Sequence, residues 1–237
     1  MQCEPVTPVP PRRVRPALLR QDWRNVGFLH WAIRPEVAAP LLPSGTRPDL
    51  LDGRTFVGLI ALRMEHTAPL GGPPLPWLGS FGQANVRLYS VDRDGRRGVV
   101  FLSLDAGRLL PAVTVRTAGL PGSWARVRVQ HQGDRCSYRG ARRTGTAHAS
   151  IGLRIGRRRE PEPLELFVTA RWGLHHRVPG RTAYTAVAHG PWPLHETELV
   201  HCDTDLLAAA GLPGVSGPPV SVLFSAGVDG ARIGPPA

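Results

Sequence analysis

The chain contains no lysine, and all 29 of its basic residues are arginine. A lysine Schiff base and a lysine general base are therefore excluded, because the arginine guanidinium stays protonated and is not a nucleophile. The arginines are spread along the sequence and give a net charge of +11 at pH 7. A solvated basic surface accounts for this charge. The alternative is a nucleic-acid-binding protein, which requires that the arginines gather on one face.

Cysteines and long apolar runs are also scarce. Three widely spaced cysteines, Cys3, Cys136 and Cys202, form no Cys-x-x-Cys pair, so they indicate neither a disulfide framework nor a zinc knuckle. No apolar run approaches the roughly 18 residues of a membrane-spanning helix. The N-terminus lacks the apolar stretch of an ordinary signal peptide. We therefore expect a cytoplasmic protein that does not associate with a membrane.

Glycine and proline are abundant, with 27 and 25 residues. They concentrate at the two ends and in loops, a composition close to that of low-complexity segments. We expect a flexible Pro- and Arg-rich tail over residues 1–19, a single folded domain over 20–212 and a Gly/Pro-rich C-terminal segment over 213–237.

Strand patterns dominate the folded part and predict a β-rich α+β domain. The predicted strands cover residues 55–64, 84–92, 98–105, 125–131, 150–155, 164–172 and 220–224. Asp94-Gly95 lies in a short polar loop between two of them and predicts a hairpin. Short helices are predicted over 34–42, 106–117 and 203–210, the last with Asp203 as its N-cap and Gly211 as its stop. The pattern indicates antiparallel sheets with a few short helices.

Familiar cofactor and metal motifs are missing. The chain has no phosphate-binding loop, no dinucleotide fingerprint, no nucleophile elbow and no His-Glu-x-x-His. Five histidines and a cysteine lie between residues 175 and 202, but their spacing matches no standard zinc arrangement. We expect no cofactor and no metal.

The segment from residue 81 to 90, FGQANVRLYS, alternates polar and apolar residues. Gln83, Asn85, Arg87 and Tyr89 share one face of the predicted strand. If both faces are covered, a buried Arg87 needs an anionic partner. A bound carboxylate is one candidate, with the other three side chains orienting it. A face open to water is another interpretation.

An internal ion pair is the competing interpretation. The following strand carries Ser103 and Asp105, which a two-residue period places in phase with Val99 and Phe101. Asp105 is then a candidate partner for Arg87 across the hairpin.

Several short motifs, taken in series, resemble the YqjF-like bacterial family, a domain of unknown function. The motifs are L-H-W at 29–31, P-x-G at 43–45, D-G at 52–53, N-V-R-x-Y at 85–89, G-V-x-F-L-S-L-D-A at 98–106, G-L-P at 119–121 and H-x-P-W-P-L at 189–194. The resemblance covers about residues 22 to 205. That family is similar to the acetoacetate-decarboxylase-like superfamily, which implies a barrel-like core with an internal cavity and small keto acids as the ancestral ligands.

The decarboxylase chemistry itself is not expected. In the decarboxylase branch a strand glutamate and a lysine pair carry the reaction, and the lysines follow a Gly-aromatic-Pro turn. Here Gly122-Ser123 follow the turn, and Gln83 stands where the YqjF-like pattern usually has glutamate. An amide does not take up a proton at neutral pH, so a general base at this position is lost as well.

Acid–base groups must then come from elsewhere, and His30, Asp105 and His189 are the catalytic candidates. A histidine titrates near neutrality and can move a proton α to a carbonyl, while an arginine holds a carboxylate or stabilises an enolate. The residues assigned to ligand binding are Gln83, Asn85, Arg87, Tyr89, Ser103 and Arg116.

Three functions remain, in order of preference. The first is a lysine-independent enzyme on small carbonyl or carboxylate compounds, such as an isomerase, cyclase, hydratase or lyase. The second is a non-catalytic protein that binds such a ligand. A basic nucleic-acid-binding protein ranks last. The sequence is also compatible with a homo-oligomer.

Overall fold

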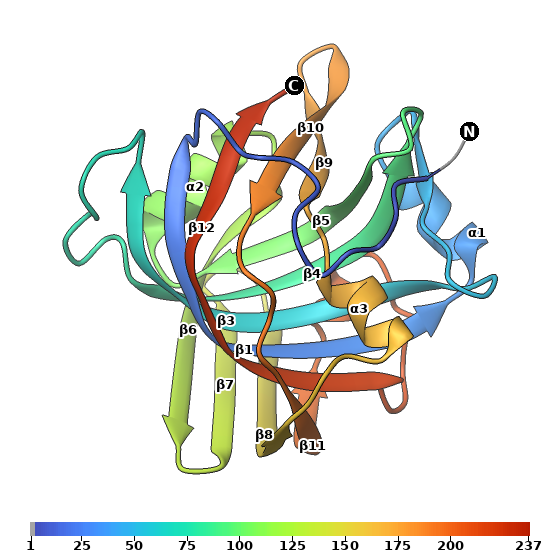
Figure 1. Cartoon of the computed structure of the whole chain (residues 1–237). Coiled ribbons are helices and arrows are strands. Elements are labelled where there is room, and N and C mark those ends of the chain that lie inside the picture. Colours follow the sequence, from blue (N-terminus) through green and yellow to red (C-terminus); the bar gives the residue numbers. More distant parts are fainter. Residues whose placement is uncertain (1–2) are drawn as a thin grey trace.

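Twelve strands form one mixed sheet that closes into a ring (Figure 1). The computed structural model describes residues 3–237. The sheet order is β10-β9-β5-β6-β7-β8-β11-β12-β1-β3-β4-β2. The strands are β1 Leu19–Ile33, β2 Thr46–Pro48, β3 Thr55–Pro69, β4 Phe81–Asp92, β5 Arg97–Ala106, β6 Gly122–Gln132, β7 Arg135–Arg142, β8 His148–Arg158, β9 Gly173–Val178, β10 Arg181–Ala188, β11 Leu194–Thr204 and β12 Ser221–Pro236.

Two further pairings, β4–β5 and β10–β12, close the sheet into two circuits. One circuit runs through β6, β7, β8 and β11, and the other runs through β9 and β10. Strands β12, β1, β3, β4 and β5 belong to both. The shared strands therefore have two covered faces, and each face belongs to a different core.

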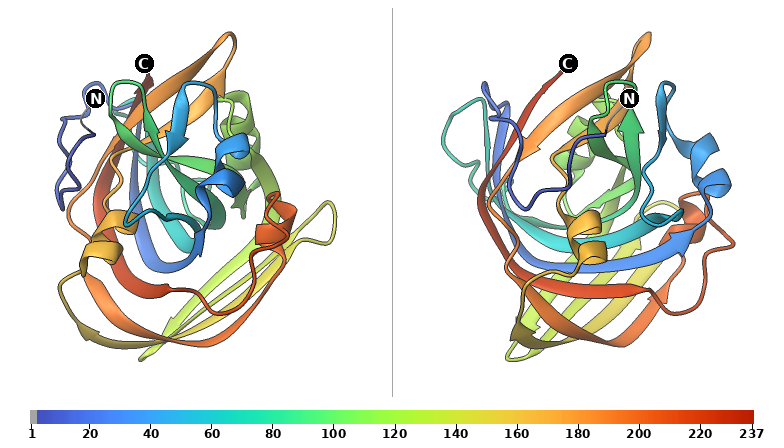
Figure 2. Two further views of the ribbon diagram at one scale, coloured as in Figure 1. Left: turned by 90° about the vertical axis from the view of Figure 1, so that its right-hand side faces the viewer. Right: turned by 45° about the vertical axis from the view of Figure 1, so that its right-hand side comes forward.

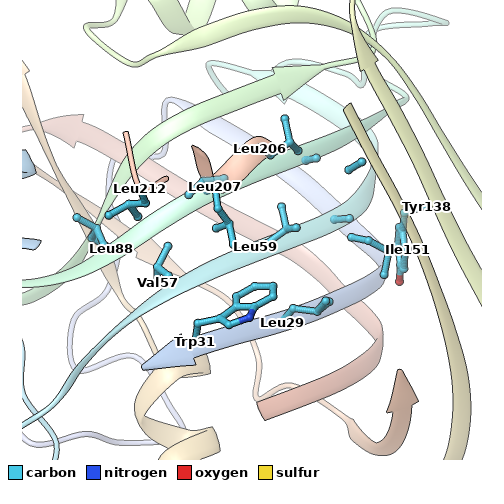
Figure 3. Close-up of a cluster of buried hydrophobic side chains, with 14 of the residues drawn as sticks. Leu29, Trp31, Val57, Leu59, Leu88, Tyr138, Ile151, Leu206, Leu207 and Leu212 are labelled. Carbon is cyan, nitrogen blue, oxygen red and sulfur yellow. The ribbon is translucent and has the colours of Figure 1, made fainter. Parts of the chain in front are cut away.

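Apolar side chains fill the first circuit (Figure 3). Leu29, Val57 and Leu59 from the shared strands face Ile151 on β8 and Leu206. Leu206 begins the short helix α4, Leu206–Ala209. This core is continuous and made almost entirely of aliphatic and aromatic side chains, so burial of apolar surface holds the circuit together.

The second circuit is less uniformly apolar. Phe28 and Ile60 lie in one buried cluster, and Tyr89 lies in a neighbouring one with Phe167 and Val168. The last two residues belong to helix α3, Pro163–Thr169, which packs against the shared strands on the face that belongs to the second circuit (Figure 1).

Most predicted elements are confirmed. The strands over 55–64, 84–92, 98–105, 125–131 and 150–155 lie within β3, β4, β5, β6 and β8, and the hairpin turn falls at Asp92–Arg96. The helix over 106–117 is α2, Leu109–Thr117, and residues 34–42 form α1, Pro35–Ala38, followed by a 3-10 turn, Ala39–Leu41. The sheet is mixed, because β5 runs parallel to β6 and to β9.

One predicted element is wrong, and one predicted helix, over 203–210, is present but begins later than expected. Residues 164–172 were expected as a strand, but a capping box between Glu162 and Glu165, with Pro163 in the first turn, starts helix α3 there. Asp203 was expected to cap a helix, but it pairs with Ser150 at the end of β11, and α4 begins three residues later. Long-range strand pairing outweighs the local capping preference in the second case.

The two ends of the chain are more structured than their composition suggests. Strand β12 was predicted only to residue 224, yet it continues to Pro236. Gly227 and Gly230 have positive φ there and interrupt the two-residue alternation. In the N-terminal segment, the carbonyl of Thr7 accepts a hydrogen bond from Trp172 Nε1 at 3.0 Å, and Val14 is buried. The expected mobility of residues 1–19 stays a prediction.

No helix among residues 3–237 is both long enough and apolar enough to pass through a membrane.

Candidate functional site

The polar face of β4 lies inside the second circuit and is not open to water. Gln83, Asn85 and Tyr89 are buried, and Arg87 is half-buried. In the register with β3, Asn85 lies opposite Ile60 and Arg87 opposite Gly58. The alternation predicted from the sequence is therefore confirmed as an internal polar row.

Arg87 has only neutral partners in the part of the chain that the structure describes. Its Nε donates to the Tyr89 hydroxyl at 3.3 Å, and its Nη2 donates to the Val168 carbonyl on α3 at 3.0 Å. The guanidinium carbon lies 5.9 Å from the centre of the Phe28 ring and 5.5 Å from that of Tyr89. The positive charge is held by aromatic faces and dipoles, with no carboxylate in ion-pair contact.

His30 is fully buried, and neither ring nitrogen has a hydrogen-bond partner among residues 3–237. Its ring centre lies 6.0 Å from that of Tyr89. Burial holds the pKa of His30 well below its ordinary value, and the positive charges of Arg87 and Arg171 lower it further. The imidazole is therefore neutral at physiological pH and retains unused hydrogen-bonding capacity.

Gly58 allows His30 and Tyr89 to meet. A Cβ at this position would lie 3.0 Å from His30 Cδ2 and 3.0 Å from the Tyr89 hydroxyl oxygen. Any side chain would therefore push the two groups apart.

His189 lies within the electrostatic field of the same arginine. Burial lowers the pKa of His189 to about 4, and the charge of Arg87 contributes to the lowering. Its Nδ1 donates to the Gly190 carbonyl at 2.6 Å. Tryptophan rings surround it, with centres 4.7 Å away for Trp172 and Trp192 and 5.2 Å away for Trp23.

The proposed ion pair between Arg87 and Asp105 is wrong. Val86 pairs with Ser103, but the next residue, Arg87, pairs with Phe101, so a bulge at Leu102 shifts the register. Asp105 pairs with Ala84 and lies on the opposite face from Arg87.

The carboxylate of Asp105 is engaged elsewhere. It accepts a hydrogen bond from Arg142 Nε with both oxygens at 3.1 Å. Burial raises the pKa of Asp105, and Arg142 opposes that rise. Ser103 is buried on the same face as Asp105, away from the polar row.

Arg116 is also separated from the row. It lies in the last turn of α2 and is exposed. The structure therefore brings together His30, Arg87 and Tyr89, places Gln83 and Asn85 on their face and sets His189 nearby. It does not bring in Asp105, Ser103 or Arg116.

The sequence missed a second buried arginine on the same tyrosine. Arg171 is buried, its guanidinium carbon lies 4.9 Å from the centre of the Tyr89 ring, and its Nε donates to the Phe167 carbonyl at 2.7 Å. It forms an ion pair with Asp49, which also pairs with Arg97. The partners come from three distant segments, so no local pattern could have predicted them.

A further polar chain links Ser90, His175 and Asp92. The Ser90 hydroxyl lies 2.8 Å from His175 Nδ1, and His175 Nε2 lies 3.3 Å from an Asp92 oxygen. The residue types are those of a hydrolytic triad, but Ser90 has no exposed surface and its hydroxyl also contacts the Gly98 carbonyl at 3.3 Å. This series of polar contacts connects β9 to the β4–β5 hairpin.

Comparison with known proteins places this geometry in a family and a fold. The model of the family DUF2071, described as "Uncharacterized conserved protein", matches residues 20–229. The uncharacterized protein YqjF of Bacillus subtilis (strain 168) is 26% identical over 186 residues, which are 76% of each chain.

Solved structures share the fold at low identity. An acetoacetate decarboxylase-like enzyme from Sphingomonas wittichii RW1 has a TM-score of 0.66 and 13% identity, over 93% of this chain and 92% of the other. The enduracididine biosynthesis enzyme MppR complexed with pyruvate has a TM-score of 0.58 and 15% identity, over 91% and 90%. The acetoacetate decarboxylase of Legionella pneumophila has a TM-score of 0.56 and 14% identity, over 95% and 92%.

Proposed function

The chain belongs to the DUF2071 family of uncharacterized conserved proteins and has the fold of acetoacetate decarboxylase-like enzymes; from this premise we propose that it binds a small keto or carboxylic acid inside its second circuit, with the carboxylate on Arg87. The observation that carries the proposal is the half-buried guanidinium of Arg87, whose protein partners are a phenol and a carbonyl, both neutral. A carboxylate would complete the charge pairing that a desolvated guanidinium requires.

The ligand class has support from one structural relative. MppR, which shares the fold, is complexed with pyruvate, a small keto acid. The polar row here offers matching groups: Arg87 for a carboxylate, and the amides of Gln83 and Asn85 for orientation. Asn85 Oδ1 is buried without a partner among the described residues, so it is available to such a ligand.

The same groups can support proton transfer without a lysine. The Tyr89 hydroxyl accepts a hydrogen bond from Arg87, so its own hydrogen is free to donate to a ligand carbonyl oxygen. A nitrogen of neutral His30 would take a proton from the carbon next to that carbonyl. The C–H electron pair would form an enolate, and Arg87 and Tyr89 would stabilise its oxygen.

Return of the proton to another carbon would give an isomer, and departure of a β substituent with the electron pair would give elimination. We therefore propose a lysine-independent isomerase or lyase, in the cytoplasm. The alternative is a protein that binds the acid without turning it over.

Thermal melting against small keto, hydroxy and enol acids tests the binding step. A ligand at 100 times its dissociation constant stabilises the fold by about 2.7 kcal/mol, which raises the melting temperature measurably. We expect this shift in the wild type and its loss in Arg87→Met. Arg116→Met removes an exposed arginine and serves as the matched control that keeps the shift.

Hydrogen exchange then separates enzyme from binding protein. In D2O, turnover through His30 would introduce deuterium at the carbon next to the carbonyl of the bound acid. NMR measures this incorporation, and His30→Phe should abolish it. Binding without exchange would leave the non-catalytic alternative, and no shift with any acid would refute the proposal.

A second candidate function, nucleic-acid binding, is favoured by one specific observation. The outward positions of β6 and β7 carry Arg126, Arg128, Arg135 and Arg139, all exposed and none in an ion pair within the described chain. Arg128 pairs directly with Arg139, although like charges at such positions are mutually destabilising. A phosphate backbone would relieve this repulsion.

Fluorescence anisotropy with a labelled single-stranded oligonucleotide tests this candidate at several salt concentrations. Binding that weakens steeply with salt in the wild type, and is lost when Arg128 and Arg139 are both replaced by serine, would support it. Binding unaffected by this double substitution would exclude this face as the site.

A further inference from the structure

We propose that a surface made by the β3–β4 loop and helix α2 binds the headgroup layer of an anionic phospholipid membrane; this inference is independent of the Arg87 site. The loop projects away from the sheet in Figure 1 and in the right-hand view of Figure 2, and α2 lies beside its base in Figure 1. Six exposed apolar side chains make up this loop–helix surface: Leu70, Leu75, Trp77, Leu109, Leu110 and Val113.

The backbone of the loop holds its apolar side chains in contact with water. Leu70 is 78% exposed and Trp77 is 72% exposed, and both have positive φ, a conformation that large side chains rarely adopt. Two backbone hydrogen bonds close the loop: Leu75 donates to the Thr67 carbonyl at 2.8 Å, and Gly79 donates to the Leu75 carbonyl at 3.0 Å. Exposed apolar clusters of this kind mark interaction sites.

Helix α2 extends the apolar area of the loop. The guanidinium carbon of Arg108, the residue before α2, lies 3.9 Å from the centre of the Trp77 ring. The Gly107 N–H donates to the Gly82 carbonyl at 2.9 Å and so connects the start of α2 to the start of β4. The exposed apolar side chains of the helix therefore lie next to those of the loop.

The charges around this surface are all positive. Residues 66–82 and 106–124 contain no aspartate and no glutamate. Arg20 on β1 pairs with Ala68, close to Leu70, and Arg116 lies in the last turn of α2. Arg20, Arg108 and Arg116 form no ion pair within residues 3–237. An anionic partner would supply the missing negative charge, and each arginine close to anionic lipid strengthens binding by roughly fivefold.

A membrane fits this combination better than a protein partner does. A second copy of the chain would bring the same arginines together across a two-fold axis, which disfavours association. None of the six apolar side chains lines the clefts of about 370 to 560 Å³ elsewhere on the described chain, so they form no groove for a partner's helix or strand.

The residue types match the chemistry of a membrane surface. Tryptophan and leucine side chains enter the boundary between headgroups and acyl chains, while arginines remain at the level of the headgroups. Peripheral binding of this kind needs no membrane-spanning helix. It revises the expectation from the sequence that the chain does not associate with a membrane.

Flotation of the full-length protein with lipid vesicles tests this inference. One set of vesicles is made of phosphatidylcholine alone, and the other has one phosphatidylserine for every three phosphatidylcholine molecules. We expect the wild type to bind the second set about tenfold or more strongly than the first, because several arginines contribute. Binding should weaken as the salt concentration rises.

Replacing the two most exposed apolar side chains measures the apolar contribution. Leu70→Ser with Trp77→Ser should weaken vesicle binding by about tenfold or more, since the membrane no longer covers their apolar area. Leu50→Ser with Val200→Ser is the matched control, because both side chains are exposed and lie before β3 and on β11, away from the loop. The control should bind as the wild type does, and both double variants should keep the wild-type melting temperature.

A second pair of double variants isolates the charges. Arg108→Gln with Arg116→Gln should weaken binding by about tenfold. Arg135→Gln with Arg139→Gln lowers the net charge equally, on β7, and should keep the binding. Equal loss in both variants would overturn the inference, because general attraction of a basic protein to an anionic surface would then explain the binding.

Two other outcomes would also overturn the inference. Absence of flotation of the wild type with the anionic vesicles would exclude the membrane as the partner. A wild-type dimer in analytical ultracentrifugation, separated into monomers by Leu70→Ser with Trp77→Ser and unable to bind vesicles, would assign the loop–helix surface to self-association.

Discussion

Two arginines flank the ring of Tyr89, and they differ in their partners. Arg171 is fully enclosed and pairs with the carboxylate of Asp49, while Arg87 is half-buried and donates only to a phenol and a carbonyl. Both guanidinium groups lie over the same ring, at 4.9 Å and 5.5 Å. The fold thus supplies a carboxylate counter-ion for Arg171 and none among the described residues for Arg87. This difference is why we propose Arg87, and not Arg171, as the arginine that binds a ligand.

The largest expected effect comes from removing the counter-ion of the structural arginine. Asp49→Asn leaves Arg171 and Arg97 without their shared carboxylate, and breaking a buried pair in this way costs about 3–5 kcal/mol of unfolding free energy. Denaturant unfolding measures it. Asp94→Asn, which removes an exposed partner of Arg96, is the control and should change stability by less than about 1 kcal/mol. Equal losses of stability in Asp49→Asn and Asp94→Asn would show that the buried carboxylate is no more important to Arg171 than an exposed one is to Arg96.

A smaller effect is expected from pH, through the histidines beside Arg87. His189 has a folded pKa of about 4, below its unfolded value of about 6.5. The unfolded state binds the proton more tightly, so protonation of His189 favours unfolding. The stabilisation that neutral His189 gives the folded state is therefore present above pH 6.5 and is lost as pH falls through the folded pKa. The loss amounts to roughly 3 kcal/mol between pH 7 and pH 4. The contribution of His30 to stability changes with pH in the same direction, because its pKa is also lowered.

The comparison of wild type with His189→Gln measures this contribution, because both proteins share the titration of all carboxylates. Unfolding free energies at several pH values should fall less steeply in the variant below pH 6.5. Parallel pH profiles would show that His189 titrates normally in the folded state.

The smallest change in stability is expected at Arg87. Arg87→Met removes a charge without a carboxylate partner and should alter the unfolding free energy by about 1 kcal/mol or less, since uncompensated buried charge contributes little net stability. The same substitution should raise the pKa of His189, which NMR titration can follow. A loss of stability as large as that of Asp49→Asn would make Arg87 structural as well.

Local patterns predicted the strand that carries the site. On β4 the side chains alternate with a two-residue period, so the sequence alone placed Gln83, Asn85, Arg87 and Tyr89 on one face. The same reasoning failed on β5, because the extra residue at Leu102 shifts the strand register. Asp105 then lies on the opposite face from Arg87, where it contacts Arg142. A bulge depends on the partner strand and leaves no signature in a short alternating segment.

Helix α3 is a second case in which the local sequence pattern did not determine the structure. Its short apolar run fits a strand as well as a helix, and the chain resolves the choice by packing Phe167 and Val168 over Tyr89. Only this choice brings the Val168 carbonyl to Arg87, 81 residues away in the sequence.

The sequence by itself determined which chemistry is excluded and which strand is polar, since the absence of lysine and the alternation of β4 are properties of residue type and local geometry. The tertiary structure alone decided which arginine has a counter-ion. Asp49 meets Arg171 across 122 residues, and His30 meets Tyr89 only where Gly58 leaves room. Such encounters depend on strand register and close packing between distant segments, which no local pattern encodes.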